Sequence, residues 1–84
     1  MLFDTMTNPE RVVSAAREET ESMRGIRILR ARHSERGWIL KYITLDDDYP
    51  IAAIERSLTR KIGEAVSMVD LHYDFDTAAR LICA

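Results

Sequence analysis

Three polar residues near the C-terminus have types and a spacing that could bind a metal ion. Asp70, His72 and Asp74 are two residues apart, so a β-strand would place all three on one face. Two carboxylates and an imidazole are plausible ligands for a divalent cation. Side chains two apart on a strand diverge, however, and another element would have to complete the site. The solvent face of a half-buried strand has the same composition, so we expect no metal.

Other catalytic and cofactor-binding patterns are incomplete. The run Asp46-Asp47-Asp48 lacks the spaced ligands and the glycine of a calcium loop, and it is better explained as a turn before a helix. Cys83 has no His or Asn around it in a recognisable catalytic arrangement. There is also no glycine-rich phosphate motif. We therefore expect no enzymatic activity and no cofactor.

Positive charge is concentrated in a short segment that ends at Trp38. Its basic residues are Arg24, Arg27, Arg30, Arg32, His33 and Arg36. The segment could bind an acidic protein surface, could form an RNA-binding face beside an aromatic ring, or could be a solvated hairpin neutralised by the glutamates of residues 10–21. Opposed blocks of charge in one small chain favour a protein over nucleic acid. The candidate protein-binding residues are Arg27, Arg30, Arg32, Arg36 and Trp38.

Composition limits the class of protein. Eighty-four residues make one small domain, residues 1–84, with little volume for a deep substrate pocket. The 14 acidic residues outnumber the 12 basic ones, whereas a dedicated nucleic-acid binder is usually clearly basic. No apolar run approaches the roughly 20 residues that span a bilayer, and no signal peptide is recognisable. A lone cysteine is typical of a reducing compartment, so we expect a cytoplasmic protein with no membrane contact.

The first half of the chain predicts a helix followed by a hairpin. Asn8 and Pro9 are a favoured cap and first helical residue, and the helix should run to about residue 22, after a short strand over residues 2–6. Two strands, 26–33 and 38–45, flank a loop that closes with a glycine. Neither face of the second strand is cleanly polar, which indicates a central strand or one covered on both sides.

The second half predicts another helix and another strand. Asp48 or Tyr49 should cap a helix with Pro50 in its first turn, and the apolar stripe of that helix is Ile51, Ile54, Leu58 and Ile62. Alternation then predicts a strand over residues 66–75, and the tail 76–84 is either a short helix or an irregular return. The expected fold is an α+β two-layer sandwich of order (β)-α-β-β-α-β, with helices on one face of a small, mainly antiparallel sheet.

Three short stretches, taken in order, carry a resemblance to a known family. They are Thr5-Met6-Thr7-Asn8 with Arg11-Val12-Val13, the hairpin region 25–45, and residues 58–71 with Ile62-Gly63 and Val69-Asp70-Leu71. This pattern resembles the small effector (coupling) proteins of bacterial multicomponent di-iron monooxygenases. The resemblance implies a cofactor-free protein that binds the hydroxylase component and tunes its active site. The chain departs from the family after residue 73, where a Ser- and Gly-rich stretch and a last strand are expected, and it lacks their N-terminal extension.

These observations support three functional hypotheses. The first is a non-enzymatic protein-binding effector, or regulatory subunit, that modulates a larger enzyme complex, for which a monooxygenase is one candidate. The second is a small inhibitor or adaptor, for example phage-encoded, that binds another enzyme or a nucleoprotein complex. The third is a small RNA- or metal-binding domain. The oligomeric state is left open.

Overall fold

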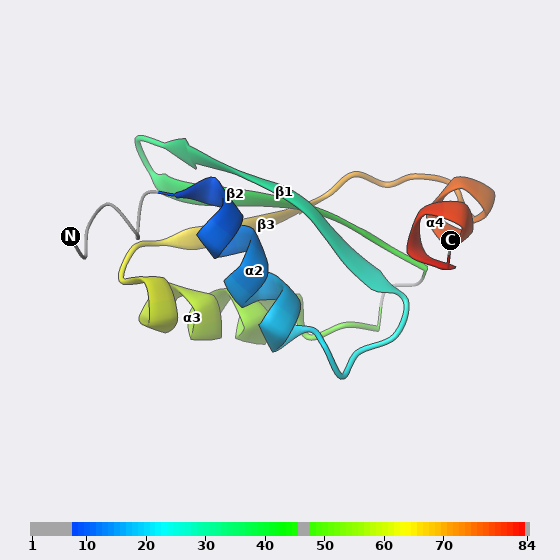
Figure 1. Ribbon diagram of the computed structural model, residues 1–84, viewed down its shortest axis with the longest axis horizontal. Coiled ribbons are helices and arrows are strands. Elements are labelled where there is room, and N and C mark those ends of the chain that lie inside the picture. Colours follow the sequence, from blue (N-terminus) through cyan, green and yellow to red (C-terminus); the bar gives the residue numbers. More distant parts are fainter. Residues whose placement is uncertain (1–7, 46–47, 84) are drawn as a thin grey trace.

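The computed structural model describes residues 8–45 and 48–83, which form three helices and three strands (Figure 1). The expected strand over residues 2–6 lies outside the described residues. The elements are α2 (Pro9–Glu19), β1 (Ile26–Ser34), β2 (Gly37–Thr44), α3 (Ile51–Ile62), β3 (Val66–Asp70) and α4 (Phe75–Cys83). The α+β class is therefore confirmed, and the predicted order holds over residues 9–70.

The sheet is mixed, which corrects the expectation of a mainly antiparallel one. The strand order is β1-β2-β3, with β1 antiparallel to β2 and β3 parallel to β2. The parallel pair arises because α3 returns the chain to the end of the sheet where β2 begins. A two-residue hairpin reverses chain direction, but a helical crossover does not, and strand alternation alone cannot distinguish the two cases. Of the two alternatives left open for the second strand, the structure shows the first, since β2 is the central strand of the sheet.

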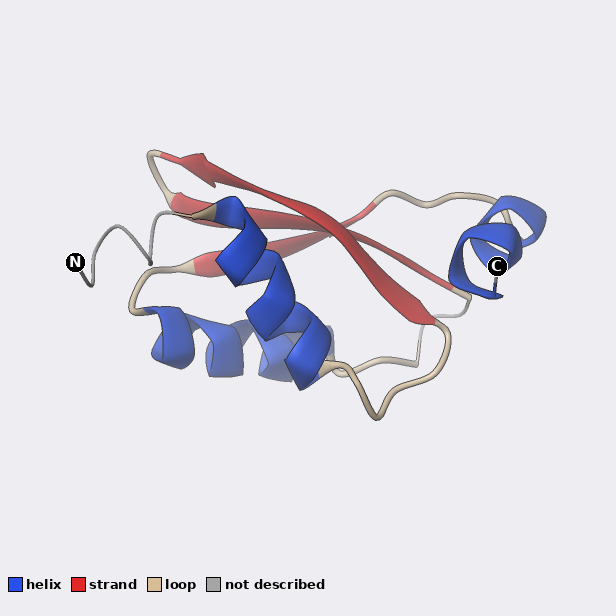
Figure 2. Ribbon diagram, viewed as in Figure 1, coloured by secondary structure: helices blue, strands red, loops and turns tan. Residues whose placement is uncertain are grey.

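Helices α2 and α3 cover one face of the sheet, as expected, and α4 lies apart from them at one end (Figures 1 and 2). The Asn8 side chain accepts a hydrogen bond from the Glu10 amide at 2.9 Å and caps α2, which ends at Glu19, earlier than predicted. Pro50, rather than Asp48 or Tyr49, occupies the N-cap position of α3. Residues 76–83 of the tail are helical, so of the two alternatives, a short helix or an irregular return, the structure shows the helix.

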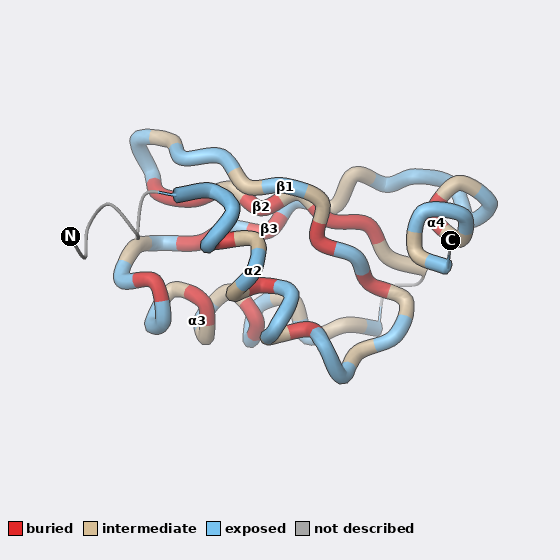
Figure 3. The backbone as a smooth tube through the Cα atoms, viewed as in Figure 1, coloured by how far each residue is buried: buried red, intermediate tan, exposed pale blue. Residues whose placement is uncertain are grey.

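The core lies between the sheet and the two covering helices (Figure 3). Leu58 of α3 and Leu40 of β2 are completely buried, and Trp38 is 1% exposed. The remaining core side chains are Val12, Ala16, Ile26, Ile28, Tyr42, Ile54, Ile62, Val66 and Met68. The predicted apolar stripe of α3 thus packs as expected, with Ile51 at its partly buried margin.

The third strand is shorter than predicted. It ends at Asp70, whereas alternation predicts a strand to residue 75. His72 has a positive φ of 54°, which no strand residue adopts, so the extended run stops there. The Asp74 carboxylate then accepts a hydrogen bond from the Thr77 amide at 2.7 Å and caps α4. Asp70, His72 and Asp74 therefore do not share one strand face.

Gly37 closes the hairpin at a place where no side chain fits. Its φ is 110°, and a Cβ built there would overlap the carbonyl oxygen of Ala65. The contact is close because Ala65 O accepts the Trp38 amide at 2.8 Å and so fastens the start of β2 to the chain entering β3. Gly63, which ends α3, also has a positive φ, of 85°, but has open space around it.

Replacing these two glycines separates backbone strain from steric overlap. We expect Gly63→Ala to cost about 1 kcal/mol of unfolding free energy, the usual penalty for a left-handed residue. Gly37→Ala should cost more, because the chain must also move away from Ala65. Chemical denaturation of both variants measures the difference. Equal losses would show that the close approach to Ala65 does not constrain the hairpin.

Leu58 is the side chain that tests the core. Leu58→Ala should lower the unfolding free energy by about 2–5 kcal/mol, since the residue is fully buried. In a chain of this size each kcal/mol lowers Tm by about 4–8 °C. Leu81→Ala is the matched control, because Leu81 is 40% exposed and should give a much smaller change. Similar melting curves for the two variants would contradict the assigned orientation of α3.

The cap of α4 predicts a pH dependence. Hydrogen bonds from the backbone and side chain of Thr77 lower the pKa of Asp74 below its ordinary value of 3.8. The charged carboxylate therefore stabilises the start of α4 above the ordinary pKa, and this contribution is lost as the pH falls through the lowered value. Amide exchange at Thr77 should be faster in Asp74→Ala than in wild type near neutral pH, and the two should converge in acid. The exposed Asp76→Ala is the control, and an effect of equal size there would contradict the assignment of the cap.

Candidate functional site

The face of the sheet opposite α2 and α3 carries basic and aliphatic side chains and one serine. Because strand residues alternate between faces, those that neighbour the core residues Trp38, Leu40 and Tyr42 point the other way. The pairing register aligns them in rows across the sheet: Arg32, Ile39 and Ser67 form one row, and Arg30, Lys41 and Val69 the next. We call these six residues the open face. All are exposed except Ile39 and Lys41, which are half-buried.

The charged residues of the open face are all positively charged. Arg30, Arg32 and Lys41 are its ionisable residues, and none of them forms an ion pair with any residue in 8–45 or 48–83. The ion pairs in that part of the chain lie elsewhere, for example between His33 and Glu64 at 2.7 Å. Since no carboxylate shares the rows, the three cations create a positive potential on a surface that also exposes apolar area.

A β-bulge brings the arginines to one face. The register of β1 shifts between Ile28 and Arg30, so Leu29 is an extra residue without a partner in β2. Strict alternation would place Arg27 on the face opposite Arg30. With the bulge, Arg27 pairs with Ile43 and lies on the same side as Arg30 and Arg32. The adjacent apolar pair Ile28-Leu29, which breaks the alternation, was the sequence signal for this shift.

The end of this side of the sheet is covered by α4. The Arg27 guanidinium donates a hydrogen bond to the carbonyl oxygen of Leu81 at 3.0 Å, which ties α4 to β1. Ile43, beside Arg27 in the register, is completely buried, and so is Ala78 of α4, although neither belongs to the main core. We conclude that α4 covers the Arg27 and Ile43 row, whereas no other element within residues 8–45 and 48–83 covers the next two rows.

The other two candidate residues do not join the open face. Trp38 points into the core, where its ring lies 4.7 Å from the His33 ring, so it offers no aromatic surface to a partner on the open face. Arg36 is exposed in the hairpin turn, where its amide donates to the Ser34 hydroxyl. Sequence reasoning missed Lys41, Ile39 and Val69 as members of the site. For Ile39 and Lys41 the signal was present in the alternation of β2, which places both on one face, whereas Val69 joins them only through the pairing of β3 with β2.

The two carboxylates of the candidate metal ligands Asp70, His72 and Asp74 form local hydrogen bonds instead of a shared site. Asp70 accepts the His72 amide at 2.7 Å, and its other oxygen lies 3.9 Å from the His72 ring. Asp74 caps α4 instead of turning toward them. Across the described ranges no three His, Cys, Asp or Glu side chains are grouped as metal ligands would be.

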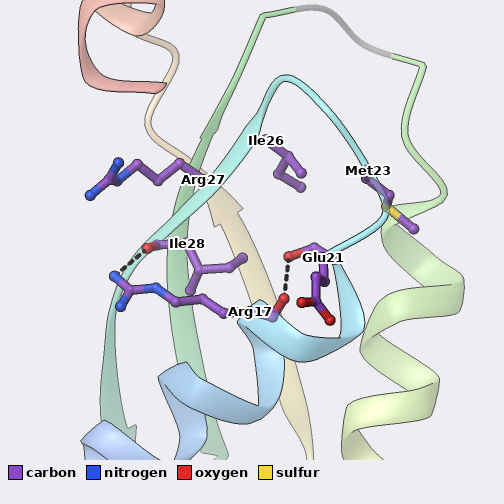
Figure 4. A pocket seen from close by; sticks show the side chains of 7 residues that line it. Arg17, Glu21, Met23, Ile26, Arg27 and Ile28 are labelled. Atoms are coloured by element: carbon purple, nitrogen blue, oxygen red, sulfur yellow. Dashed lines mark hydrogen bonds between the residues drawn. The ribbon is translucent and has the colours of Figure 1, made fainter. Parts of the chain in front are cut away.

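A shallow hollow lies where the end of α2 meets the start of β1 (Figure 4). Arg17 on its wall donates a hydrogen bond to the Ile28 carbonyl oxygen at 3.0 Å. The Thr20 hydroxyl is also used within the chain, since it donates to Ala16 O at 3.0 Å. The Arg17 bond links α2 to the edge strand β1, and the Thr20 bond lies within the C-terminal turn of α2. Because both polar groups are used within the chain, the open face is the stronger candidate for binding.

Comparisons with known proteins give no relative. No protein-family model matches the chain, and no curated protein and no solved structure shows significant similarity to it. Among the described helices, none is both long and apolar enough to cross a membrane. The functional argument therefore depends on the open face itself.

Proposed function

We propose that this chain is a non-enzymatic protein-binding effector that modulates a larger enzyme or complex, and that an acidic surface of the partner docks on the open face. The observation that supports this most is the grouping of Arg30, Arg32 and Lys41 on one face that no described element covers and where no described acidic residue pairs with them. Carboxylates of a partner would supply the missing counter-charges and would speed association.

The chemistry of the open face favours protein over RNA. Proteins that recognise single-stranded RNA stack its bases on aromatic side chains. The six residues of the open face include no aromatic ring, and Trp38 is buried on the other side. The apolar side chains of Ile39 and Val69 lie among the cations, a mixture that suits a protein interface with an apolar centre and a polar rim.

The resemblance to monooxygenase effector proteins makes a hydroxylase component the first partner to test. An inhibitor or adaptor would use the open face in the same way, with a different enzyme or complex as its target. Both versions propose a protein that acts by binding, and they differ in the partner.

Charge reversal on the open face tests this proposal. In Arg30→Glu/Arg32→Glu the association rate with the partner should fall by at least about tenfold near 0.1 M salt, because electrostatic steering is lost. The defect should shrink at high salt, where exposed charges are screened. Surface plasmon resonance at several salt concentrations measures both effects.

The matched control is Arg56→Glu/Arg60→Glu, which makes the same charge change on exposed positions of α3. It should leave association nearly unchanged, and Tm should confirm that both variants fold. Equal rates for the two double variants would contradict the proposal. Binding that disappears after nuclease treatment would instead assign the open face to nucleic acid.

A further inference from the structure

The open face is divided into two strips that run along the strands. Its arginines, Arg30 and Arg32, lie on β1, whereas the apolar Ile39 and Val69 lie on β2 and β3, with Lys41 between the strips. A partner that fits this pattern has an apolar stripe with carboxylates along one side. An amphipathic helix and an extended strand could both have such a stripe, and the dimensions and edges of the sheet distinguish them.

The face has the width of one helix. Three strands about 4.8 Å apart place the outer two roughly 10 Å from each other, and an α-helix with side chains is about 10–12 Å wide. The part of β1 that no described element covers on this side, residues 30–34, spans about 17 Å at 3.3 Å per residue. That is the length of roughly 11 helical residues.

The edges of the sheet are poorly suited to adding a strand. On the β3 edge, the Met68 amide donates to the Glu55 carboxylate at 2.6 Å and the Val66 amide to the Thr59 hydroxyl at 3.1 Å. On the β1 edge, Arg17 occupies the Ile28 carbonyl oxygen, and the bulge at Leu29 interrupts the ladder. A partner strand would have to displace these bonds, but a helix on the face would displace none of them.

The chain itself places a helix at the end of this face. Helix α4 is fastened to β1 by the hydrogen bond of Arg27, the register partner of the completely buried Ile43, and Ala78 of α4 is completely buried as well. The large apolar side chains that are exposed in the described residues all occur from β3 onward, at Val69, Tyr73, Phe75 and Leu81. Of these, Val69 belongs to the open face, and the other three follow it in the chain, between the end of β3 and the end of α4.

We infer that the open face accepts one acidic amphipathic α-helix of the partner, about three turns long, which lies on the sheet next to α4. This inference rests on the proposed function and specifies the form of the partner. The helix places its apolar stripe on Ile39 and Val69 and its carboxylates along Arg30, Arg32 and Lys41. A second copy of the chain fits less well, because two open faces would bring their cations together.

Selection from a library of random 16-residue peptides tests the inference. Displayed peptides are selected on the wild-type protein and depleted on Arg30→Glu/Arg32→Glu. The selected peptides should be rich in Asp and Glu, with apolar residues at three- and four-residue spacing. They should bind the double variant at least about tenfold more weakly, become helical on binding by circular dichroism, and shift the methyl resonances of Ile39 and Val69.

Other results would overturn the inference in distinguishable ways. Acidic peptides with apolar residues at alternate positions, which shift amides along an edge strand, would replace the helix with a strand and leave the proposed function standing. Selected peptides that bind wild type and the double variant equally would contradict the inference that the open face binds a helix. A selection that enriches no peptide for wild type over the double variant would contradict it as well. The partner association rates described above would then decide the proposed function independently. A dimer in light scattering whose Ile39 and Val69 methyls are protected would assign the face to a second copy.

Discussion

The pairing of β2 with a neighbour on each side is the constraint on which the structure depends. Its register with β1 and β3 directs Trp38, Leu40 and Tyr42 into the core and Ile39 and Lys41 to the opposite face. A slip of one residue would exchange the two sets, burying the lysine and exposing the tryptophan. The core and the candidate site are therefore two consequences of one register, and the burial of the first set fixes the exposure of the second.

The bulge at Leu29 adds the second half of this arrangement. It shifts the phase of β1 so that Ile28 faces the core before the bulge and Ala31 after it, while Arg27, Arg30 and Arg32 remain together on the other side. The charges also help to explain how a sheet face that the described helices leave open can be tolerated. Exposed apolar area on a sheet favours association, and like charges beside Ile39 and Val69 oppose pairing between copies. The same positive charges attract a partner whose surface is negatively charged.

The elements with local signals were predictable from the sequence. Three features depend on residues close together in the chain: the Asn8 cap, the stripe of Ile54, Leu58 and Ile62, and the hairpin around Gly37. For most of the boundaries of these elements, the prediction and the structure agree within one or two residues. The direction of β3 was not predictable in this way, because it depends on a crossover through α3. The end of β3 was also missed, since the alternation continues in the residue types after the backbone turns at His72.

The candidate site was only half predictable for the same reason. The arginines stand out as a cluster in the chain, but their common face depends on a bulge, and their neighbours Lys41 and Val69 come from other strands. Trp38 was placed with them because it is adjacent in sequence, yet adjacent strand residues point in opposite directions. Which residues share a surface is a property of pairing, and it could be obtained only once the register was known.

Methyl relaxation by soluble gadolinium chelates tests most directly whether this face is open and positively charged. A neutral chelate should relax the methyls of Ile39 and Val69 strongly and leave those of Leu40 and Ile43, which are fully buried, almost unaffected. An anionic chelate of the same size should relax Ile39 and Val69 more than the neutral one does, because Arg30, Arg32 and Lys41 attract it. Protection of Ile39 and Val69 from both chelates, or equal relaxation by the two, would contradict the account of an uncovered cationic face.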